Sequence, residues 1–96
     1  MAGIIWSDEA WDDLDSIFLR LNAESQSYSK KWINEVFKKT DLLKQFPAMG
    51  RGVPEIRLNS IREIFAGNYR IIYNIGKDAN VEIMAIRHSA KPLSEF

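Results

Sequence analysis

Cysteine is missing from this 96-residue chain, and histidine occurs once, as His88. Without cysteine the protein has no disulfide bonds and no thiolate that would bind a metal or act as a nucleophile. A single histidine also argues against a histidine-based metal site. These shortages exclude the common zinc and cysteine chemistries, and we expect no metal and no cofactor.

Long apolar runs are absent as well. No stretch approaches the roughly 18 consecutive apolar residues of a membrane-spanning helix, and no basic leader precedes an apolar segment. We therefore expect a cytoplasmic protein with no membrane partner. The composition, 46% hydrophobic and 27% charged, is that of an ordinary globular protein, and the length suffices for one core but not for two. Residues 1–96 are expected to form a single domain.

An excess of charge of one sign is also lacking, because 13 basic residues balance 13 acidic ones. The charges are unevenly spread: residues 1–29 hold six acids against Arg20, a balance of −5, and residues 30–96 carry +5. Overall neutrality is weak evidence against DNA or RNA as a direct ligand, since phosphate neutralisation supplies most of the affinity of such proteins. The acidic run within residues 8–15 is compatible with a cation site or, more simply, with a solvated helix face.

The region 61–88 is predicted to form three strands, at residues 61–65, 69–75 and 81–87, because these segments are rich in β-branched and aromatic residues. Short turns join the strands, so they must be antiparallel neighbours. If Ala66 pairs with Tyr69, Glu63 and Arg70 become diagonal neighbours on one face of the sheet.

Two amphipathic helices are predicted in the first half. Ser7 is a suitable N-cap for the first helix, and the second is expected over residues 28–45, ending before Pro47. A polar link makes them an antiparallel hairpin whose apolar face needs the sheet as its cover. Residues 4–6 are predicted to add an edge strand. The expected fold is α+β, two layers in the order β-α-α-β-β-β on an antiparallel sheet. The predicted core comprises Leu14, Ile17, Phe18, Trp32, Ile33, Val36, Phe37, Ile71 and Ile83.

A loop rich in glycine and proline, FPAMGRGVPE, follows the second helix. Gly50 and Gly52 flank Arg51 in a pattern too short for a phosphate-binding loop, which needs a strand before it and a helix after it. We expect a structural connector. Leu42 lies among the polar residues of the second helix, which suggests a contact with a partner. Residues 89–96 are predicted to be a short, loose, polar tail.

Four motifs in order resemble the RelE/ParE superfamily of bacterial toxin–antitoxin toxins, sometimes called plasmid stabilisation proteins. They are P-x-x-G-R at residues 47–51, I-R-E at 61–63, Y-R-I-I-Y at 69–73 and the histidine at 88. The resemblance spans essentially the whole chain. It implies a small toxin that is neutralised by a cognate antitoxin, whose flexible segment folds over it in a hetero-oligomeric complex.

The superfamily contains two activities: RelE-like members cleave mRNA on the ribosome, and ParE-like members inhibit DNA gyrase. For a nuclease, the resemblance assigns Arg70 to the scissile phosphate, with His88 and Lys91 as the other candidate catalytic residues. However, the two lysines of RelE-like nucleases correspond to Ile61 and Glu63, and no tyrosine follows His88. A carboxylate at this position would repel an RNA phosphate. The chain is therefore closer to ParE, with mRNA cleavage as the alternative and a plain interaction module as a third possibility.

The remaining candidate residues are expected to contact the antitoxin or the target: Leu42, Arg51, Arg62, Tyr73 and Arg87. Structural roles stay open for several of the candidates. Arg70 can form a salt bridge with Glu63, His88 can be a hydrogen-bonded surface group, Tyr73 can pack on the helices, and Arg51 can be a solvated loop residue.

Overall fold

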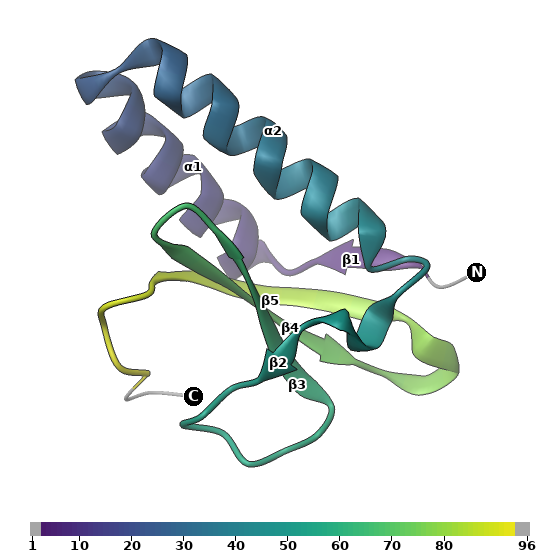
Figure 1. The fold of residues 1–96 in the computed structure, drawn as a ribbon. Coiled ribbons are helices and arrows are strands. Elements are labelled where there is room, and N and C mark those ends of the chain that lie inside the picture. Colours follow the sequence, from purple (N-terminus) through teal and green to yellow (C-terminus); the bar gives the residue numbers. More distant parts are fainter. Residues whose placement is uncertain (1–2, 94–96) are drawn as a thin grey trace.

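The computed structural model describes residues 3–93 and contains two helices above a five-stranded sheet (Figure 1). The elements are β1 (Ile4–Trp6), α1 (Asp8–Glu24), α2 (Gln26–Leu42), the 3-10 turn η1 (Pro47–Met49), β2 (Arg51–Gly52), β3 (Ile61–Ala66), β4 (Tyr69–Ile75), the 3-10 turn η2 (Lys77–Ala79) and β5 (Val81–His88). The predicted order is confirmed. The two-residue strand β2 lies where only a connector was expected.

The sheet has the strand order β1-β5-β4-β3-β2. The predicted meander is confirmed with its register, since Ala66 pairs with Tyr69 and Arg62 with Tyr73. The prediction of a wholly antiparallel sheet is wrong, because β1 runs parallel to β5. The whole helical hairpin separates β1 from the meander, so no tight turn dictates the direction of β1 and a parallel pairing is accessible.

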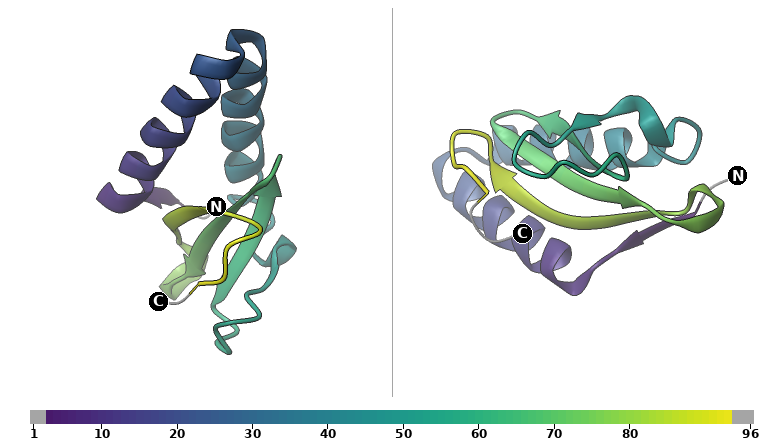
Figure 2. Two further views of the ribbon diagram at one scale, coloured as in Figure 1. Left: turned by 90° about the vertical axis from the view of Figure 1, so that its left-hand side faces the viewer. Right: turned by 90° about the horizontal axis from the view of Figure 1, so that it is seen from below.

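A single residue, Ser25, joins the two helices. It ends α1 and caps α2, where its Oγ accepts a hydrogen bond from the backbone N–H of Tyr28 at 3.2 Å. The polar link that was predicted between the helices is therefore only one residue long, and α2 (Gln26–Leu42) starts and ends earlier than the predicted range 28–45. Ser7 caps α1 as expected, with its Oγ 3.0 Å from the backbone nitrogen of Ala10. The helices meet at Ser25 and diverge toward the sheet (Figure 2).

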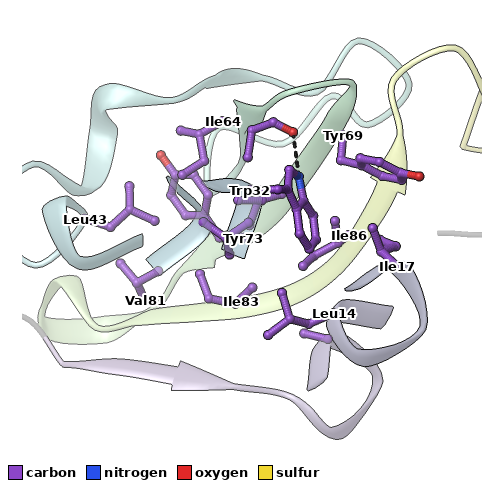
Figure 3. Close-up of a cluster of buried hydrophobic side chains, with 14 residues drawn as sticks. Leu14, Ile17, Trp32, Leu43, Ile64, Tyr69, Tyr73, Val81, Ile83 and Ile86 are labelled. Atoms are coloured by element: carbon purple, nitrogen blue, oxygen red, sulfur yellow. Dashed lines mark hydrogen bonds between the residues drawn. The ribbon is translucent and has the colours of Figure 1, made fainter. Parts of the chain in front are cut away.

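The core lies between the hairpin and one face of the sheet (Figure 3). Six predicted core residues are buried, and Phe18 and Ile33 are partly buried against them. Phe37 was wrongly predicted, since 42% of it is exposed. The buried side of α2 includes Trp32, Val36 and Thr40. Phe37 follows Val36 directly in the sequence and therefore points to a neighbouring side of the helix. There it contacts the indole rings of Trp6 and Trp11.

The segment after β5 folds back onto the sheet over residues 89–93. The backbone N–H of Leu93 donates to Glu55 Oε2 at 3.0 Å, and the carbonyl of Lys91 accepts from Arg70 at 2.7 Å. The prediction of a loose tail is therefore wrong for these five residues, because two side chains from elsewhere in the fold bind their backbone. Its last part, residues 94–96, lies outside the described residues.

Candidate functional site

A group of four charged residues occupies the sheet face that points away from the helices. We call Arg51, Glu55, Glu63 and Arg70 the Arg70 cluster. Arg70 contacts Glu63 at 3.1 Å and Glu55 at 2.8 Å, and Arg51 Nε contacts the other oxygen of Glu63 at 2.7 Å. The side chains of Arg70 and Glu63 are 5% and 0% exposed. The two arginines and two glutamates balance each other, so the cluster is neutral as a unit.

The ionisation of the cluster follows from these contacts. Hydrogen bonds from Arg70, and then from the backbone N–H of Leu93, lower the pKa of Glu55 from 4.5 to about 2. Hydrogen bonding to Glu55 raises the pKa of Arg70, against the opposing effect of burial. Both groups are therefore charged at neutral pH, and the arginine is engaged by carboxylates.

The predicted nuclease set of Arg70, His88 and Lys91 is not assembled at one place. His88 pairs with Tyr69 across the sheet, and their rings lie edge to face at 5.3 Å. Since side chains alternate along a strand, His88 and Tyr69 share the face opposite to Arg70. Lys91 contacts Arg70 only through its backbone carbonyl.

A separate pocket of about 460 Å³ brings His88 and Lys91 together with α1. Its lining includes Arg20 and Tyr69, and Nη2 of Arg20 donates a hydrogen bond to the Tyr69 hydroxyl. Sequence reasoning did not single out these two residues as a site. One feature of the sequence could have drawn attention to Arg20: it is the only lysine or arginine among the acidic first 29 residues.

Two of the predicted partner-binding residues, Leu42 and Arg51, line a groove between α2 and the β2–β3 edge. This α2–β3 groove has a volume of about 450 Å³ and also includes Met49 and Phe65. Leu42 and Met49 are 41% and 42% exposed. The Arg51 guanidinium lies over the Phe65 ring at 5.1 Å and is paired with Glu63, so the groove combines apolar surface with a charged pair.

Arg62 and Tyr73 instead fasten the segment that precedes β2. The Tyr73 hydroxyl donates to the carbonyl of Pro47 at 2.6 Å and accepts from the N–H of Gly50 at 3.0 Å, and Arg62 donates to the Gly50 carbonyl at 2.9 Å. Tyr73 is 0% exposed, and burial raises its pKa. A Cβ on Gly50 would lie 2.6 Å from the Tyr73 hydroxyl, so this close approach requires glycine. In this structure Tyr73 belongs to the core.

Arg87, the last predicted partner-binding residue, binds α1. Its guanidinium forms ion pairs with Asp13 and, at 3.0 Å, with Glu9. Asp13 also accepts a hydrogen bond from the backbone N–H of Ile86 at 2.9 Å. These contacts attach the beginning of α1 to the end of β5, and they explain part of the acidic run as a structural feature.

The two edges of the sheet differ in their accessibility. Along β3, beyond the short strand β2, residues of α2 bind the backbone: Trp32 Nε1 donates to the Ala66 carbonyl at 3.0 Å, and Lys39 donates to the carbonyl of Phe65. β1 is the outer strand at the other edge. Beside it Trp6 and Trp11 stack at 4.5 Å, with 46% of Trp11 exposed.

Neither a metal site nor a transmembrane helix occurs in the described part of the chain. Residues 3–93 contain no group of three or more histidine, aspartate or glutamate side chains suited to holding a metal ion. No helix in the same range has the length and hydrophobicity to cross a membrane.

The described residues thus form a helical hairpin on a five-stranded sheet with a parallel β1. A solved structure described as the chromosomal ParDE TA system from P. aeruginosa is similar, with a TM-score of 0.73, 19% sequence identity, and coverage of 92% of this chain and 96% of that chain. The sequence profile of the family described as the ParE toxin of type II toxin-antitoxin system, parDE, matches residues 4–93. The chain belongs to this ParE toxin family. No curated protein sequence matches it.

Proposed function

We propose that this protein inhibits DNA gyrase in the cytoplasm and is neutralised when a cognate antitoxin binds it. The observation that carries the first part is the state of Arg70, which is buried and ion-paired with Glu55 and Glu63. Nucleases that work without metal need cationic groups directed at the phosphate, and loss of one such group typically costs a factor of about 10²–10³ in rate. Because two carboxylates already bind Arg70, it is poorly placed to bind a phosphate. This favours a toxin that acts by binding its target and not by cleaving RNA.

The positions of the other candidates support the same proposal. His88 and Arg70 lie on opposite faces of the sheet, and residue 63, where a nuclease would have a lysine, is a carboxylate bound to Arg51. General acid–base catalysis requires the acid, the base and the phosphate ligand within hydrogen-bonding reach of one reacting group. Residues 3–93 do not offer that arrangement, and the family match does not favour mRNA cleavage either.

The α2–β3 groove is the surface that we propose for the antitoxin. Leu42, Met49 and Phe65 supply apolar surface, and Lys39 and Arg51, which are paired with Glu35 and Glu63, supply exposed cationic groups at its border. An amphipathic helix with acidic residues beside its apolar face fits this combination. The excess of positive charge in residues 30–96 favours the same acidic partner.

A strand added by the antitoxin would have to pair with β1, at the edge of the sheet away from β2 and β3. Trp32 and Lys39 already bind the backbone carbonyls at the end of β3. The outer side of β1 has only three residues, so it would give a short extension, with the stacked Trp6 and Trp11 as an apolar support. We therefore propose the groove as the main contact and β1 as a secondary one.

The test of gyrase inhibition uses the purified protein in two assays. We expect it to inhibit DNA supercoiling by gyrase, with cleaved DNA accumulating, and to leave mRNA on translating ribosomes uncut in primer extension. Addition of the protein encoded by the neighbouring antitoxin gene should restore supercoiling. Cuts in the ribosomal A site with normal supercoiling would refute the proposal.

A variant separates a target contact from a structural role of Arg70. Arg70→Ala removes the partner of two carboxylates and is expected to lower both toxicity and the free energy of unfolding. If toxicity falls while stability is unchanged, Arg70 contacts the target directly. Full toxicity in a variant that remains folded would show that Arg70 serves neither purpose.

A further inference from the structure

The pocket that contains Arg20 lies on the helix side of the sheet, away from the Arg70 cluster. It is formed by α1, the first residue of β4, the end of β5 and the tail, and has a volume of about 460 Å³. The polar side chains that line it include Ser16, Arg20, Tyr69, His88 and Lys91. We call it the Arg20 pocket. Three separate segments of the chain bring these groups to one place.

Several hydrogen-bond donors in the pocket have no acceptor among residues 3–93. Arg20 donates one bond, to the Tyr69 hydroxyl, although a guanidinium has five N–H groups. The hydroxyl accepts this bond, so its own hydrogen is left over, and no acceptor for it occurs within residues 3–93. Tyr69 is 6% exposed, whereas the side chain of Arg20 is exposed and presents its remaining donors to the open side of the pocket.

The histidine adds another donor. His88 Nδ1 accepts a hydrogen bond from the backbone N–H of Ala90 at 3.1 Å. In the neutral ring the hydrogen must therefore be on Nε2. Among the described residues Nε2 has no partner, and neither does the ammonium group of Lys91.

Negative charge in the pocket is already used. Asp13 is the carboxylate of the lining, and it is bound by Arg87 and by the backbone N–H of Ile86. Neither Arg20 nor Lys91 forms an ion pair with a carboxylate in the described part of the chain. Within residues 3–93, the pocket thus has two positive charges without a carboxylate partner, although the chain as a whole is neutral.

We propose that the Arg20 pocket binds a phosphate group of a phosphate ester. Four side chains from three segments of the chain offer hydrogen-bond donors, and a ligand with several acceptor oxygens would bind them together. These side chains are Arg20, Tyr69, His88 and Lys91. A phosphate offers three or more oxygens in a tetrahedral arrangement, whereas a carboxylate offers two in a plane. Arginine beside lysine is a common combination for phosphate, with a planar fork and a point charge. This inference rests on the pocket alone and does not require gyrase to be the target.

The test uses the full-length, isotope-labelled protein, with inorganic phosphate as the probe. In NMR titrations at constant ionic strength we expect saturable shifts of the Arg20 Nε–H and of the Ala90 amide. Arg20→Gln and Lys91→Gln should each weaken binding about tenfold or more, as expected for loss of a charge-assisted hydrogen bond. Arg57→Gln removes an exposed cation outside the pocket and should leave the dissociation constant unchanged.

Two further probes identify the source of the phosphate. A nucleoside 5′-monophosphate that binds more tightly than inorganic phosphate would support a monoester ligand, and a dinucleotide that does so would support a diester. Absence of saturable shifts at 50 mM phosphate would overturn the proposal. Equal affinity for acetate, or equal weakening by Arg57→Gln, would also overturn it. If Arg20→Gln does not fold, Lys91→Gln, which alters an exposed side chain, decides the matter.

Discussion

The guanidinium of Arg70 and the carboxylate of Glu63 lie 3.1 Å apart on the sheet face opposite to the helices, and both side chains are almost fully buried. The pair connects β3 and β4 diagonally, as the strand register predicts. Arg51 from β2 and Glu55 from the following loop complete the cluster. Because Arg70 and Glu63 are both buried, removing Arg70 leaves Glu63 with the exposed Arg51 as its remaining partner.

Glu63→Gln is expected to destabilise the protein measurably. The glutamine keeps the size of the side chain but removes the charge that faces Arg70 and Arg51. Arg70 retains Glu55 as its partner, so the free energy of unfolding should fall by about 1–3 kcal/mol, as for loss of a charge-assisted hydrogen bond. Urea denaturation measures the change. Glu82→Gln, an exposed glutamate on β5, is the matched control and should change stability by less than about 0.5 kcal/mol. Equal, small effects of both variants would show that the cluster does not contribute to stability.

Acid should weaken the fold through Glu55. Its pKa is lowered from 4.5 to about 2 in the folded state, so between these values the unfolded chain takes up a proton that the folded chain does not. This contribution to stability is complete above about pH 4.5 and is lost as the pH falls toward 2. Urea midpoints at pH 3 and pH 6 should therefore differ less in Glu55→Gln than in the wild type. An identical pH dependence in the two proteins would contradict the assignment.

Phe37 and Ile71 should respond very differently to truncation. Phe37 is 42% exposed and touches Trp6 and Trp11 at the surface, so Phe37→Ala should cost about 1 kcal/mol. Ile71 is 0% exposed, and Ile71→Ala should cost about 3 kcal/mol, within the range for deletions in a packed core. Thermal and urea denaturation of both variants provide the comparison. If Phe37→Ala lowered the free energy of unfolding more than Ile71→Ala does, the Phe37 ring would belong to the core.

Leu42→Glu should weaken antitoxin binding. It puts a carboxylate into the apolar part of the α2–β3 groove, and loss of a central contact typically lowers affinity about tenfold or more. Isothermal titration calorimetry with the purified antitoxin gives the dissociation constant. Leu19→Glu is the matched control, because Leu19 is 60% exposed on α1 and does not line the groove. A greater loss of affinity for Leu19→Glu than for Leu42→Glu would show that the antitoxin binds α1 instead of the α2–β3 groove.

Local patterns were sufficient for much of the fold. Ser7 was recognised as a helix cap, and the turn at residues 66–68 determined the strand register that places Glu63 beside Arg70. Both features depend on residues close together in the sequence, where hydrogen-bond geometry and the alternation of side chains along a strand leave few options. Neighbouring motifs in order also identified the toxin superfamily.

Contacts between distant segments were decided only by the tertiary structure. The parallel pairing of β1 with β5 and the exposure of Phe37 depend on how the helical hairpin is placed over the sheet. The same placement brings Arg20 to Tyr69, 49 positions further along the chain, while the pairing of β4 with β5 puts Arg70 and His88 on opposite faces of the sheet. Residue types and short-range spacing carry no information on such distances, because the orientation of a hairpin on a sheet results from packing of the whole core.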